Sequence, residues 1–250
     1  MTLTRNPGGK LVEKESSTML SKYLRTLLDW VFPPICAACG KEGEIFCAEC
    51  LGAIIPIKQP TCRYCSLSLA KPGICTRCLE GDHPYTEVVS YAVYSGSLRS
   101  AIHAMKYQNN FWLGELLSRH MIALLKDKNW PIDVVMPIPL SEERLEERGY
   151  NQAALLSKPI AKYFGWKHDQ RSLVRIKGNH SQVALTREQR FENVRSAFLS
   201  EIPTQSNLRV LLVDDVFTTG ATITEASKTL RATGFTDIYA ITLAKASIRN

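Results

Sequence analysis

Between residues 88 and 243, short apolar runs alternate with segments whose apolar residues recur every three or four positions. The short runs predict buried strands, and the helical spacing predicts amphipathic helices. The predicted strands are 88–94, 133–138, 209–213 and 238–243, and the predicted helices are 97–106, 112–126, 151–164 and 223–233. Strands that alternate with helices favour a parallel sheet with right-handed crossovers. We therefore expect an α/β fold for most of the chain.

Two adjacent carboxylates, Asp214 and Asp215, follow the predicted strand 209–213. A loop of small residues comes next and leads into the predicted helix 223–233; it contains Thr218, Thr219, Gly220, Ala221 and Thr222. A helix N-terminus offers free N–H groups and a positive dipole end, which suit a phosphate. The carboxylates repel a phosphate but can bind hydroxyls or a metal ion beside it. The stretch predicts a ligand such as ribose 5-phosphate; the alternative is a strand and capped helix without a ligand.

The run 210–222 resembles the phosphoribosyl diphosphate (PRPP) signature of the type I phosphoribosyltransferases. This resemblance implies that the acidic pair holds the 2- and 3-hydroxyls of the ribose and that the loop holds its 5-phosphate. A P-loop is the obvious competitor, but it requires a Gly-Lys-Ser/Thr ending that this sequence lacks.

A second loop is expected in the same crevice, because ligands of parallel sheets bind beyond the C-terminal strand ends. It follows the predicted strand 133–138 and contains Arg144 and Arg148. A diphosphate leaving group needs cations at this place, so both arginines are candidates. The alternative is that they pair with neighbouring glutamates on a helix surface.

All 8 cysteines fall in four Cys-x-x-Cys pairs, which are Cys36/Cys39, Cys47/Cys50, Cys62/Cys65 and Cys75/Cys78. Two such pairs supply the four thiolates of a tetrahedral zinc site, so the pattern predicts two structural zinc ions. Pairing in sequence order closes shorter loops and is favoured by closure entropy, while the crossed pairing stays open. Disulfides are the main alternative; they require an oxidising compartment, and residues 1–18 lack the apolar segment of a signal peptide.

The N-terminal region divides into a polar, flexible tail, 1–18, and a segment with apolar residues at helical spacing, 19–34. The second segment predicts an amphipathic helix that Pro33 and Pro34 end. It packs on the rest of the protein or, alternatively, makes a peripheral contact with a membrane surface. It is too short to cross a bilayer, and no other apolar run approaches the needed length. We expect a cytoplasmic protein without a transmembrane segment.

The net charge of +7 favours anionic partners, and Lys and Arg outnumber Asp and Glu clearly within 171–195. Cations bind the backbone of a single strand and aromatic rings stack on its bases. The nucleic-acid candidates are Arg175, Lys177, Arg187 and Arg190, with Tyr150, Phe191 and Phe198 as stacking candidates. The alternatives are a solvated basic face and aromatic rings buried in the core.

Further motifs make the chain similar to the ComF family of late competence proteins over about residues 28–245. They are the cysteine pairs, Met105-Lys106-Tyr107, Pro137-Ile138-Pro139, Arg148-Gly149-Tyr150-Asn151-Gln152, and Arg175 to Gln182 with Arg190, Asn193 and Phe198. The resemblance implies a phosphoribosyltransferase-like domain, 85–250, behind a double zinc ribbon, 35–82. It also implies DNA uptake and handling of single-stranded DNA during natural transformation, with other DNA-uptake proteins as partners.

The same resemblance implies that PRPP binds with Mg²⁺ at Val213, Asp214, Asp215, Lys106 and the loop from Thr218 to Thr222. If the protein is an enzyme, Asp214, Asp215 and Arg148 are the expected catalytic residues. The alternative function is therefore transfer of phosphoribose from PRPP to an unidentified base or other acceptor.

Overall fold

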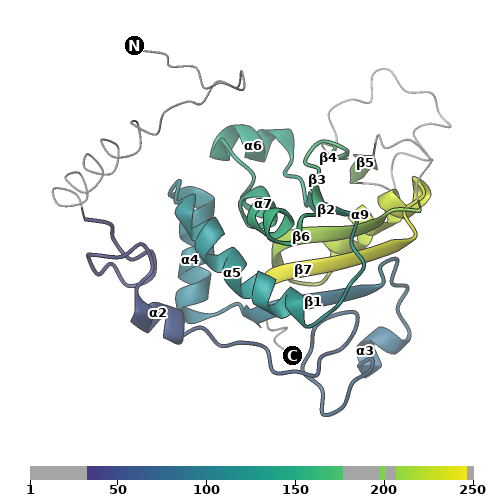
Figure 1. The fold of residues 1–250 in the computed structure, drawn as a ribbon, viewed down its shortest axis with the longest axis horizontal. Coiled ribbons are helices and arrows are strands. Elements are labelled where there is room, and N and C mark those ends of the chain that lie inside the picture. Colours follow the sequence, from purple (N-terminus) through teal and green to yellow (C-terminus); the bar gives the residue numbers. More distant parts are fainter. Residues whose placement is uncertain (1–32, 177–196, 201–206, 247–250) are drawn as a thin grey trace, which may run out of the picture.

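The computed structural model describes residues 33–176, 197–200 and 207–246. Its centre is a five-stranded sheet in the order β1-β7-β6-β2-β3, in which every neighbouring pair is parallel (Figure 1). The strands are β1 (Glu87–Val93), β2 (Val134–Pro137), β3 (Lys167–His168), β6 (Arg209–Phe217) and β7 (Asp237–Lys245). A separate antiparallel pair consists of β4 (Leu173–Arg175) and β5 (Phe198–Ser200). The predicted parallel α/β class is confirmed.

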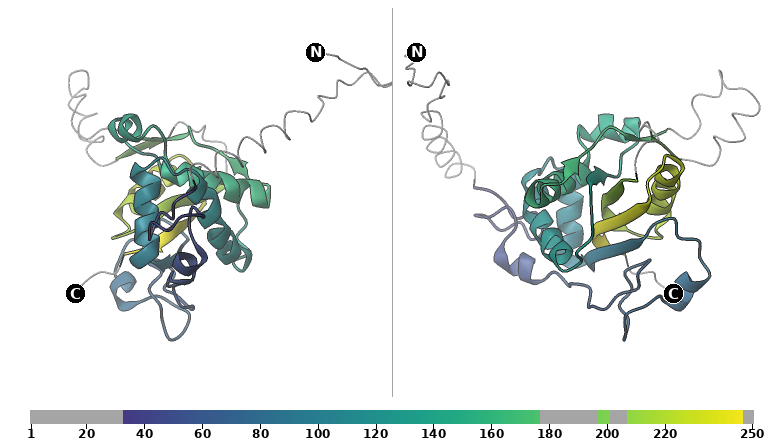
Figure 2. Two further views of the ribbon diagram at one scale, coloured as in Figure 1. Left: turned by 90° about the vertical axis from the view of Figure 1, so that its left-hand side faces the viewer. Right: turned by 45° about the vertical axis from the view of Figure 1, so that its right-hand side comes forward.

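Helices cover both faces of the sheet, as Figures 1 and 2 show. Helices α4 (Gly96–Tyr107), α5 (Trp112–Lys126) and α7 (Gln152–Phe164) cover one face, and α9 (Ala221–Ala232) covers the other. The other described helices are α2 (Ala48–Gly52), α3 (Thr76–Leu79) and α6 (Glu142–Arg148). Leu211 and Val213 of β6 join the core under α4, α5 and α7, whereas Val210 and Leu212 join the core under α9. Burial on both faces explains why the strands were visible in the sequence as continuous apolar runs.

Strand β6 is longer than predicted, because it runs to Phe217 instead of ending at Val213. On one side β2 stops at Pro137, opposite Val213, while on the other side β7 continues to Lys245, opposite Phe217. Asp214 and Asp215 therefore lie within β6, at the point where the strand has lost its β2 neighbour but keeps β7.

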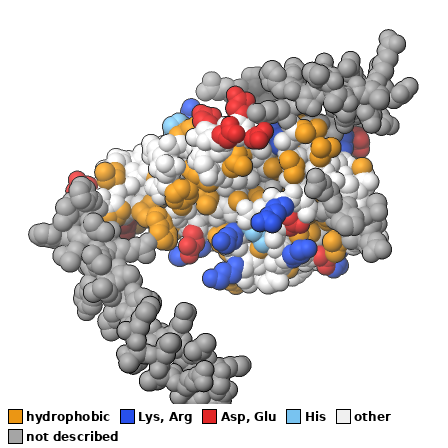
Figure 3. Space-filling view, turned by 90° about the horizontal axis from the view of Figure 1, so that it is seen from above, with side chains coloured by type: hydrophobic (Ala, Val, Ile, Leu, Met, Phe, Trp, Pro, Cys, Tyr) orange, Lys and Arg blue, Asp and Glu red, His pale blue; other side chains and the backbone are white. Residues whose placement is uncertain are grey.

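Residues between β2 and α7 contain a helix, α6, that the hydrophobic pattern did not predict. None of its residues is buried, so it carries no apolar stripe. Its glutamates face solvent, and the view from above in Figure 3 shows acidic side chains gathered at this place. The left-handed Gly149, with φ +73°, ends the helix.

The N-terminal module consists of two cysteine knuckles that pack on opposite faces of the sheet. The first knuckle (residues 35–53, with α2) contributes Phe46 to the core under α4, α5 and α7. The second knuckle (residues 61–79, with α3) places Tyr64 against the core under α9. Figure 1 shows α2 and α3 well separated, on either side of the sheet domain.

The linker between the knuckles runs along the free edge of β1. Ile57 N donates to Tyr91 O at 2.9 Å, and Val93 N donates to Ile55 O at 2.9 Å. Pro56 forms an antiparallel bridge with Ala92 between these two bonds. This pairing covers a strand edge that would otherwise present unsatisfied backbone groups.

The predicted tail, 1–18, and nearly all of the predicted helix, 19–34, lie outside the described residues. Within the described ranges, the helices are all too short or too polar to cross a bilayer.

Candidate functional site

The acidic pair at the end of β6 forms the centre of the candidate site. Asp215 is 4% exposed, and its Oδ2 lies 2.6 Å from Nζ of Lys106, in the last turn of α4. The carboxyl of Asp214 lies close to the Asp215 carboxylate, which acts on it both by charge and by a side-chain hydrogen bond. The Asp215 N–H donates to Oδ1 of Asp214 at 2.8 Å. Burial and the adjacent Asp215 carboxylate raise the pKa of Asp214 above its ordinary range.

These contacts give the two carboxylates different partners and therefore different chemical environments. Lys106 neutralises Asp215, which is therefore held in one orientation. Asp214 gains from any hydroxyl donor or cation that approaches it, since such a partner stabilises the charged form. The pair can accept hydrogen bonds from a diol or contribute oxygen ligands to Mg²⁺, which prefers carboxylates.

The loop after β6 has the geometry of an anion site. Gly220 has φ +85° and is the N-cap of α9, and a Cβ there would lie 2.7 Å from Cζ of Phe217. Thr218 and Thr219 are exposed, and Oγ1 of Thr219 accepts from Ala221 N at 3.3 Å. The first turn of α9, which includes Thr222, contains no acidic residue. Its amide groups and dipole therefore suit a phosphate.

Arg148 contacts Tyr107, which follows Lys106 in the chain. Its guanidinium donates to Tyr107 Oη at 3.2 Å and to Gln152 Oε1 at 3.0 Å, and it lies 4.9 Å from the Tyr107 ring centroid. The alternative considered for Arg148, pairing with neighbouring glutamates, is not what its described contacts show. Arg144 lies exposed on α6. Of the two arginines, only Arg148 is connected to the site by these contacts.

Val213 is fully buried, so its side chain packs in the core and only its backbone is available to a ligand. Its carbonyl accepts from Ile138 N at 2.9 Å, which joins the ends of β6 and β2. Asn151 donates its Nδ2 to Ile138 O at 2.9 Å and its Oδ1 accepts from Ala153 N, so the same side chain caps α7 and fixes the β2 loop. The two loops that the sequence predicted in one crevice are thus connected through β2.

The basic segment can be placed only in part, because Lys177, Arg187, Arg190 and Phe191 lie outside the described residues. Arg175 lies in β4 with its guanidinium 5.4 Å from the ring centroid of Phe198. Phe198 is 1% exposed and belongs to the core under α9. The stacking role considered for Phe198 is therefore wrong, since a buried ring cannot face a base. Tyr150 donates its hydroxyl to Met105 O and contacts Phe111 edge to face.

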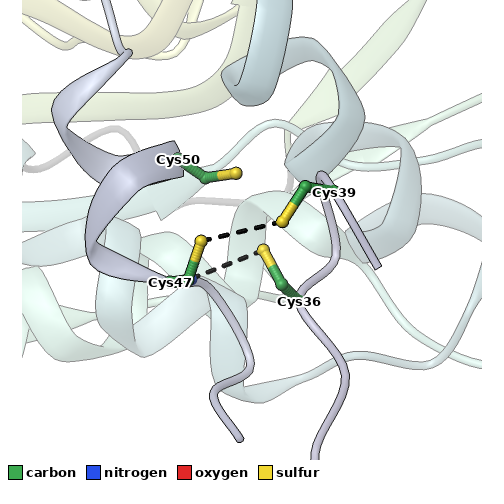
Figure 4. Close-up of side chains that lie close together, drawn as sticks. All are labelled: Cys36, Cys39, Cys47 and Cys50. Carbon is green, nitrogen blue, oxygen red and sulfur yellow. Dashed lines mark hydrogen bonds between the residues drawn. The ribbon is translucent and has the colours of Figure 1, made fainter. Parts of the chain in front are cut away.

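The eight cysteines form two groups of four, as the sequential pairing predicted. Within each group the sulfur atoms all lie within 4.8 Å of one another, and Figure 4 shows the four thiols of the first knuckle converging. The Cys39–Cys47 and Cys65–Cys75 sulfur distances are both 3.7 Å. A tetrahedral site with Zn–S bonds of about 2.3 Å places its sulfurs about 3.8 Å apart. The ligand set fits zinc, and the crossed pairing is excluded.

Backbone amides stabilise one thiolate in each group. Cys47 N donates to Cys36 Sγ at 3.4 Å, and Cys75 N donates to Cys62 Sγ at 3.3 Å. Burial raises the pKa of Cys36, but hydrogen bonds from Cys47, Cys39 and Ala38 outweigh burial and lower it to about 6. A thiolate is the form that binds metal, so these bonds prepare the ligands.

Together, the parallel sheet, the acidic pair before a phosphate-type loop and the two four-cysteine groups define a class: an α/β protein with a structural zinc module. Residues 27–79 match the double zinc ribbon domain. Competence protein F of Haemophilus influenzae is 30% identical over 223 residues, which are 85% of this chain and 90% of that protein. The chain belongs to the competence protein F (ComF) family.

Other relatives agree with this assignment. The DNA utilization protein YhgH of Salmonella typhimurium is 30% identical over 194 residues, or 75% of this chain and 85% of that protein. Competence protein ComFC of Bacillus subtilis is 24% identical over 206 residues, which are 78% of this chain and 81% of that protein. A solved structure, the allosteric regulatory enzyme of purine biosynthesis, matches 52% of this chain and 26% of its own at TM-score 0.36 and 16% identity, a likeness too distant to support an argument.

Proposed function

We propose that this protein binds PRPP with Mg²⁺ at the end of β6 and handles single-stranded DNA during natural transformation. The family supports the second part, because its members carry the names competence protein and DNA utilization protein. The proposal includes a cytoplasmic location, where reducing conditions keep the cysteines available as zinc ligands. It also includes the division into a flexible tail, 1–18, an amphipathic helix, 19–34, a double zinc ribbon, 35–82, and a phosphoribosyltransferase-like domain, 85–250.

One observation carries the PRPP proposal: the acidic pair lies near the end of β6, and the turn that suits an anion follows directly, between Phe217 and α9. Asp215 is fixed by Lys106, and α9 starts at the left-handed Gly220 with no acidic residue in its first turn. A ribose 5-phosphate matches both parts, because its hydroxyls donate to carboxylates and its phosphate accepts from amides. Arg148 supplies a cation for the diphosphate on the side of β2.

Mg²⁺ fits the same residues, since Asp214 offers carboxylate oxygens beside the position of the diphosphate. When bound, the ion neutralises charge on the diphosphate oxygens. The residues of the chain hold the ribose, orient the phosphate and fix the position of the Asp215 carboxylate through its ion pair with Lys106.

Isothermal titration calorimetry with PRPP and Mg²⁺ tests this function. Asp214→Asn removes one charged acceptor, worth about 1.5–3 kcal/mol, so the affinity should fall about tenfold or more. Asp127→Asn, an exposed residue at the end of α5, is the matched control and should bind normally. A wild-type affinity that Asp214→Asn leaves unchanged would contradict the proposed site.

The DNA part has its own test. Fluorescence anisotropy with a labelled single strand should show affinity that falls steeply as salt rises, because phosphate contacts release counterions. Replacing Lys177, Arg187 and Arg190 together with Gln should flatten this salt dependence. If the labelled single-stranded DNA binds this variant as tightly as it binds the wild type, the basic segment is not the DNA contact.

Transfer of phosphoribose to a base is the second candidate function. A cavity of about 660 Å³ beside Thr218 and Thr219 favours it, because a transferase needs room for an acceptor next to the ribose. Release of diphosphate from PRPP in the presence of a base, measured by a coupled phosphate assay, separates this function from binding alone.

A further inference from the structure

The eight cysteines, all of which lie within the described residues, differ in how far solvent reaches them. Cys39 is exposed, whereas the other three of the first knuckle, Cys36, Cys47 and Cys50, are buried. In the second knuckle Cys65 is half-buried and the remaining three are buried. An oxidant in solution reacts with a thiolate only if it can reach the sulfur. The two knuckles therefore offer different access to their sulfurs, although their metal-site geometry is the same.

The surroundings of each knuckle explain this difference. Cys39 and Cys65 occupy the same place, the second cysteine of the first pair. Cys65 lines the cavity beside Thr218 together with Lys245, so the sheet domain partly covers it. Cys39 begins a run of exposed residues, 39–44, and Gly40 has φ +78° with nothing within 4 Å of its Cβ position. The turn that presents Cys39 is therefore open to solvent.

A second sulfur lies beside Cys39 and can complete an oxidation. The Cys39 and Cys47 sulfurs are 3.7 Å apart, and Figure 4 shows both turned toward the centre of the group. A disulfide requires about 2.05 Å, so a movement of less than about 2 Å joins them. The sulfur of Cys36 accepts the Cys47 N–H at 3.4 Å, and this residue is only 2% exposed. An accessible thiolate with a resolving partner is typical of cysteines that react with peroxides.

We propose that Cys39 is an oxidation site through which hydrogen peroxide releases the zinc ion of the first knuckle. The Cys39 thiolate attacks one peroxide oxygen, which gives a sulfenic acid, and the other oxygen leaves as water. The Cys47 thiolate then attacks the sulfenic sulfur, which gives the disulfide and a second water. Solvent supplies two protons, and the two electrons lost by the thiolates reduce the peroxide. Cys36 and Cys50 remain, which are too few ligands for a tetrahedral zinc site.

Oxidation of the first knuckle should also reach the acidic pair through α4. Cys47 is the N-cap of α2, and the carbonyl of Cys50 in α2 accepts from Ser97 Oγ, near the start of α4, at 2.7 Å. In the last turn of α4, Lys106 Nζ lies 2.6 Å from Asp215 Oδ2. Loss of the hydrogen bond to α4 should weaken PRPP binding about threefold. This consequence rests on the proposed PRPP function, whereas the oxidation site itself does not.

Titration of the zinc-loaded full chain with hydrogen peroxide tests the inference. A colorimetric chelator measures released zinc, and mass spectrometry after alkylation of the remaining thiols locates the disulfide. We expect the first knuckle to lose its zinc at least about fivefold faster than the second, with Cys39–Cys47 as the first disulfide. Dithiothreitol with added zinc should restore two ions. Equal rates for the two knuckles, or a first disulfide that leaves Cys39 reduced, would overturn the inference.

A pair of matched variants sharpens this test. Cys39→His keeps a zinc ligand and removes the exposed sulfur, because histidine can replace one cysteine in a structural zinc site. This variant should retain both ions at a peroxide dose that removes one from the wild type. Cys65→His, at the equivalent position of the second knuckle, is the control and should lose the first-knuckle ion as the wild type does. Equal peroxide sensitivity of Cys39→His and wild type would exclude Cys39 as the site. If a variant does not bind zinc, the order of disulfides in the wild type decides.

Calorimetry with PRPP and Mg²⁺ on the reduced and oxidised protein separates this inference from the proposed function. If peroxide opens the first knuckle but neither form binds PRPP, the PRPP site is wrong and the oxidation site stands. If PRPP binds and the first knuckle resists peroxide, the inference is overturned and the proposed function stands. Equal PRPP affinity of the two forms would overturn the connection through α4.

Discussion

The two knuckles have the same local structure but contribute differently to the site. Each has four sulfurs in metal-site geometry and one amide-to-sulfur bond at the same position. The first knuckle packs under α4, where Ser97 donates to Cys50 O at 2.7 Å, and α4 ends in Lys106. The second knuckle forms one wall of the cavity beside Thr218. A repeated motif therefore supports the acidic pair on one face and borders the phosphate loop on the other.

The largest effect should come from removing one zinc ligand at the equivalent position of each knuckle. Structural zinc contributes on the order of 10 kcal/mol in isolated zinc fingers. Cys36→Ser and Cys62→Ser should each lower the zinc content from two ions to one and lower Tm by about 10 °C or more. The zinc content is measured by atomic absorption and Tm by calorimetry.

Ligand binding should then distinguish the two variants. Cys36→Ser should weaken PRPP binding more, because α4 loses support at the end opposite Lys106. Cys62→Ser should weaken PRPP binding less, because the second knuckle borders the site only beside Thr218 and Thr219. Identical binding profiles of the two variants would show that the knuckles do not have separate roles.

The next largest effect is expected at Gly220, where the loop between the acidic pair and α9 turns. Gly220→Ala places a Cβ 2.7 Å from Phe217 Cζ at φ +85°. A left-handed non-glycine residue costs about 1–2 kcal/mol, and the contact with the ring adds to it. We expect urea denaturation to show a loss of about 2 kcal/mol or more, with loss of PRPP binding. Gly165→Ala, at φ +71° with open space, is the control for the backbone cost alone.

A smaller loss of stability is expected when the serine hydroxyls that attach the knuckles to the sheet domain are removed. Ser97 binds Cys50 O, and Ser66, which is 1% exposed, donates to Val88 O at 3.0 Å. Loss of a hydrogen bond costs about 0.5–1.5 kcal/mol, and a buried acceptor without a partner costs about 1–3 kcal/mol. Urea denaturation should therefore show a larger loss for Ser66→Ala than for Ser97→Ala. The reverse order would mean that the first knuckle is the more tightly attached.

The smallest effect concerns a contact away from both knuckles. Arg209 donates to both carboxylate oxygens of Asp133, at 2.8 and 2.9 Å, and these bonds lower the pKa of Asp133 to about 2. A carboxyl with a lowered folded pKa stabilises the protein above its unfolded pKa of about 3.9. That stability is lost as pH falls from about 4 to 2. The pair is partly exposed, so Asp133→Asn should cost less than about 1 kcal/mol at pH 7 and nearly nothing at pH 2.

Patterns within the sequence predicted much of the fold. The helix 112–126 coincides with α5, because its apolar stripe is long and regular. The pairing of cysteines within each knuckle also followed from spacing. Helix α6 was missed because its charged residues bury nothing, and the length of β6 was missed because it depends on pairing with β7. Contacts that only tertiary packing creates left no local signal.

In the candidate site, too, local sequence predicted some residues, while others depend on tertiary packing. Asp214, Asp215 and the Gly220 loop were identified because their roles lie on one continuous stretch. Lys106 was named by resemblance, but its ion pair with Asp215 joins elements that are far apart in the chain. Lys245 was missed: a lysine at the end of a buried strand was its only signal, and its position at the cavity depends on how the second knuckle packs.

The most direct test of the central claim is a crystal structure of the zinc-loaded protein with PRPP and Mg²⁺. The account predicts density for the ribose with its 2- and 3-hydroxyls within hydrogen-bond distance of Asp214 and Asp215, and for the 5-phosphate on the amides that follow Gly220. PRPP bound at any other place, or an empty β6 end in crystals soaked at saturating PRPP, would contradict it.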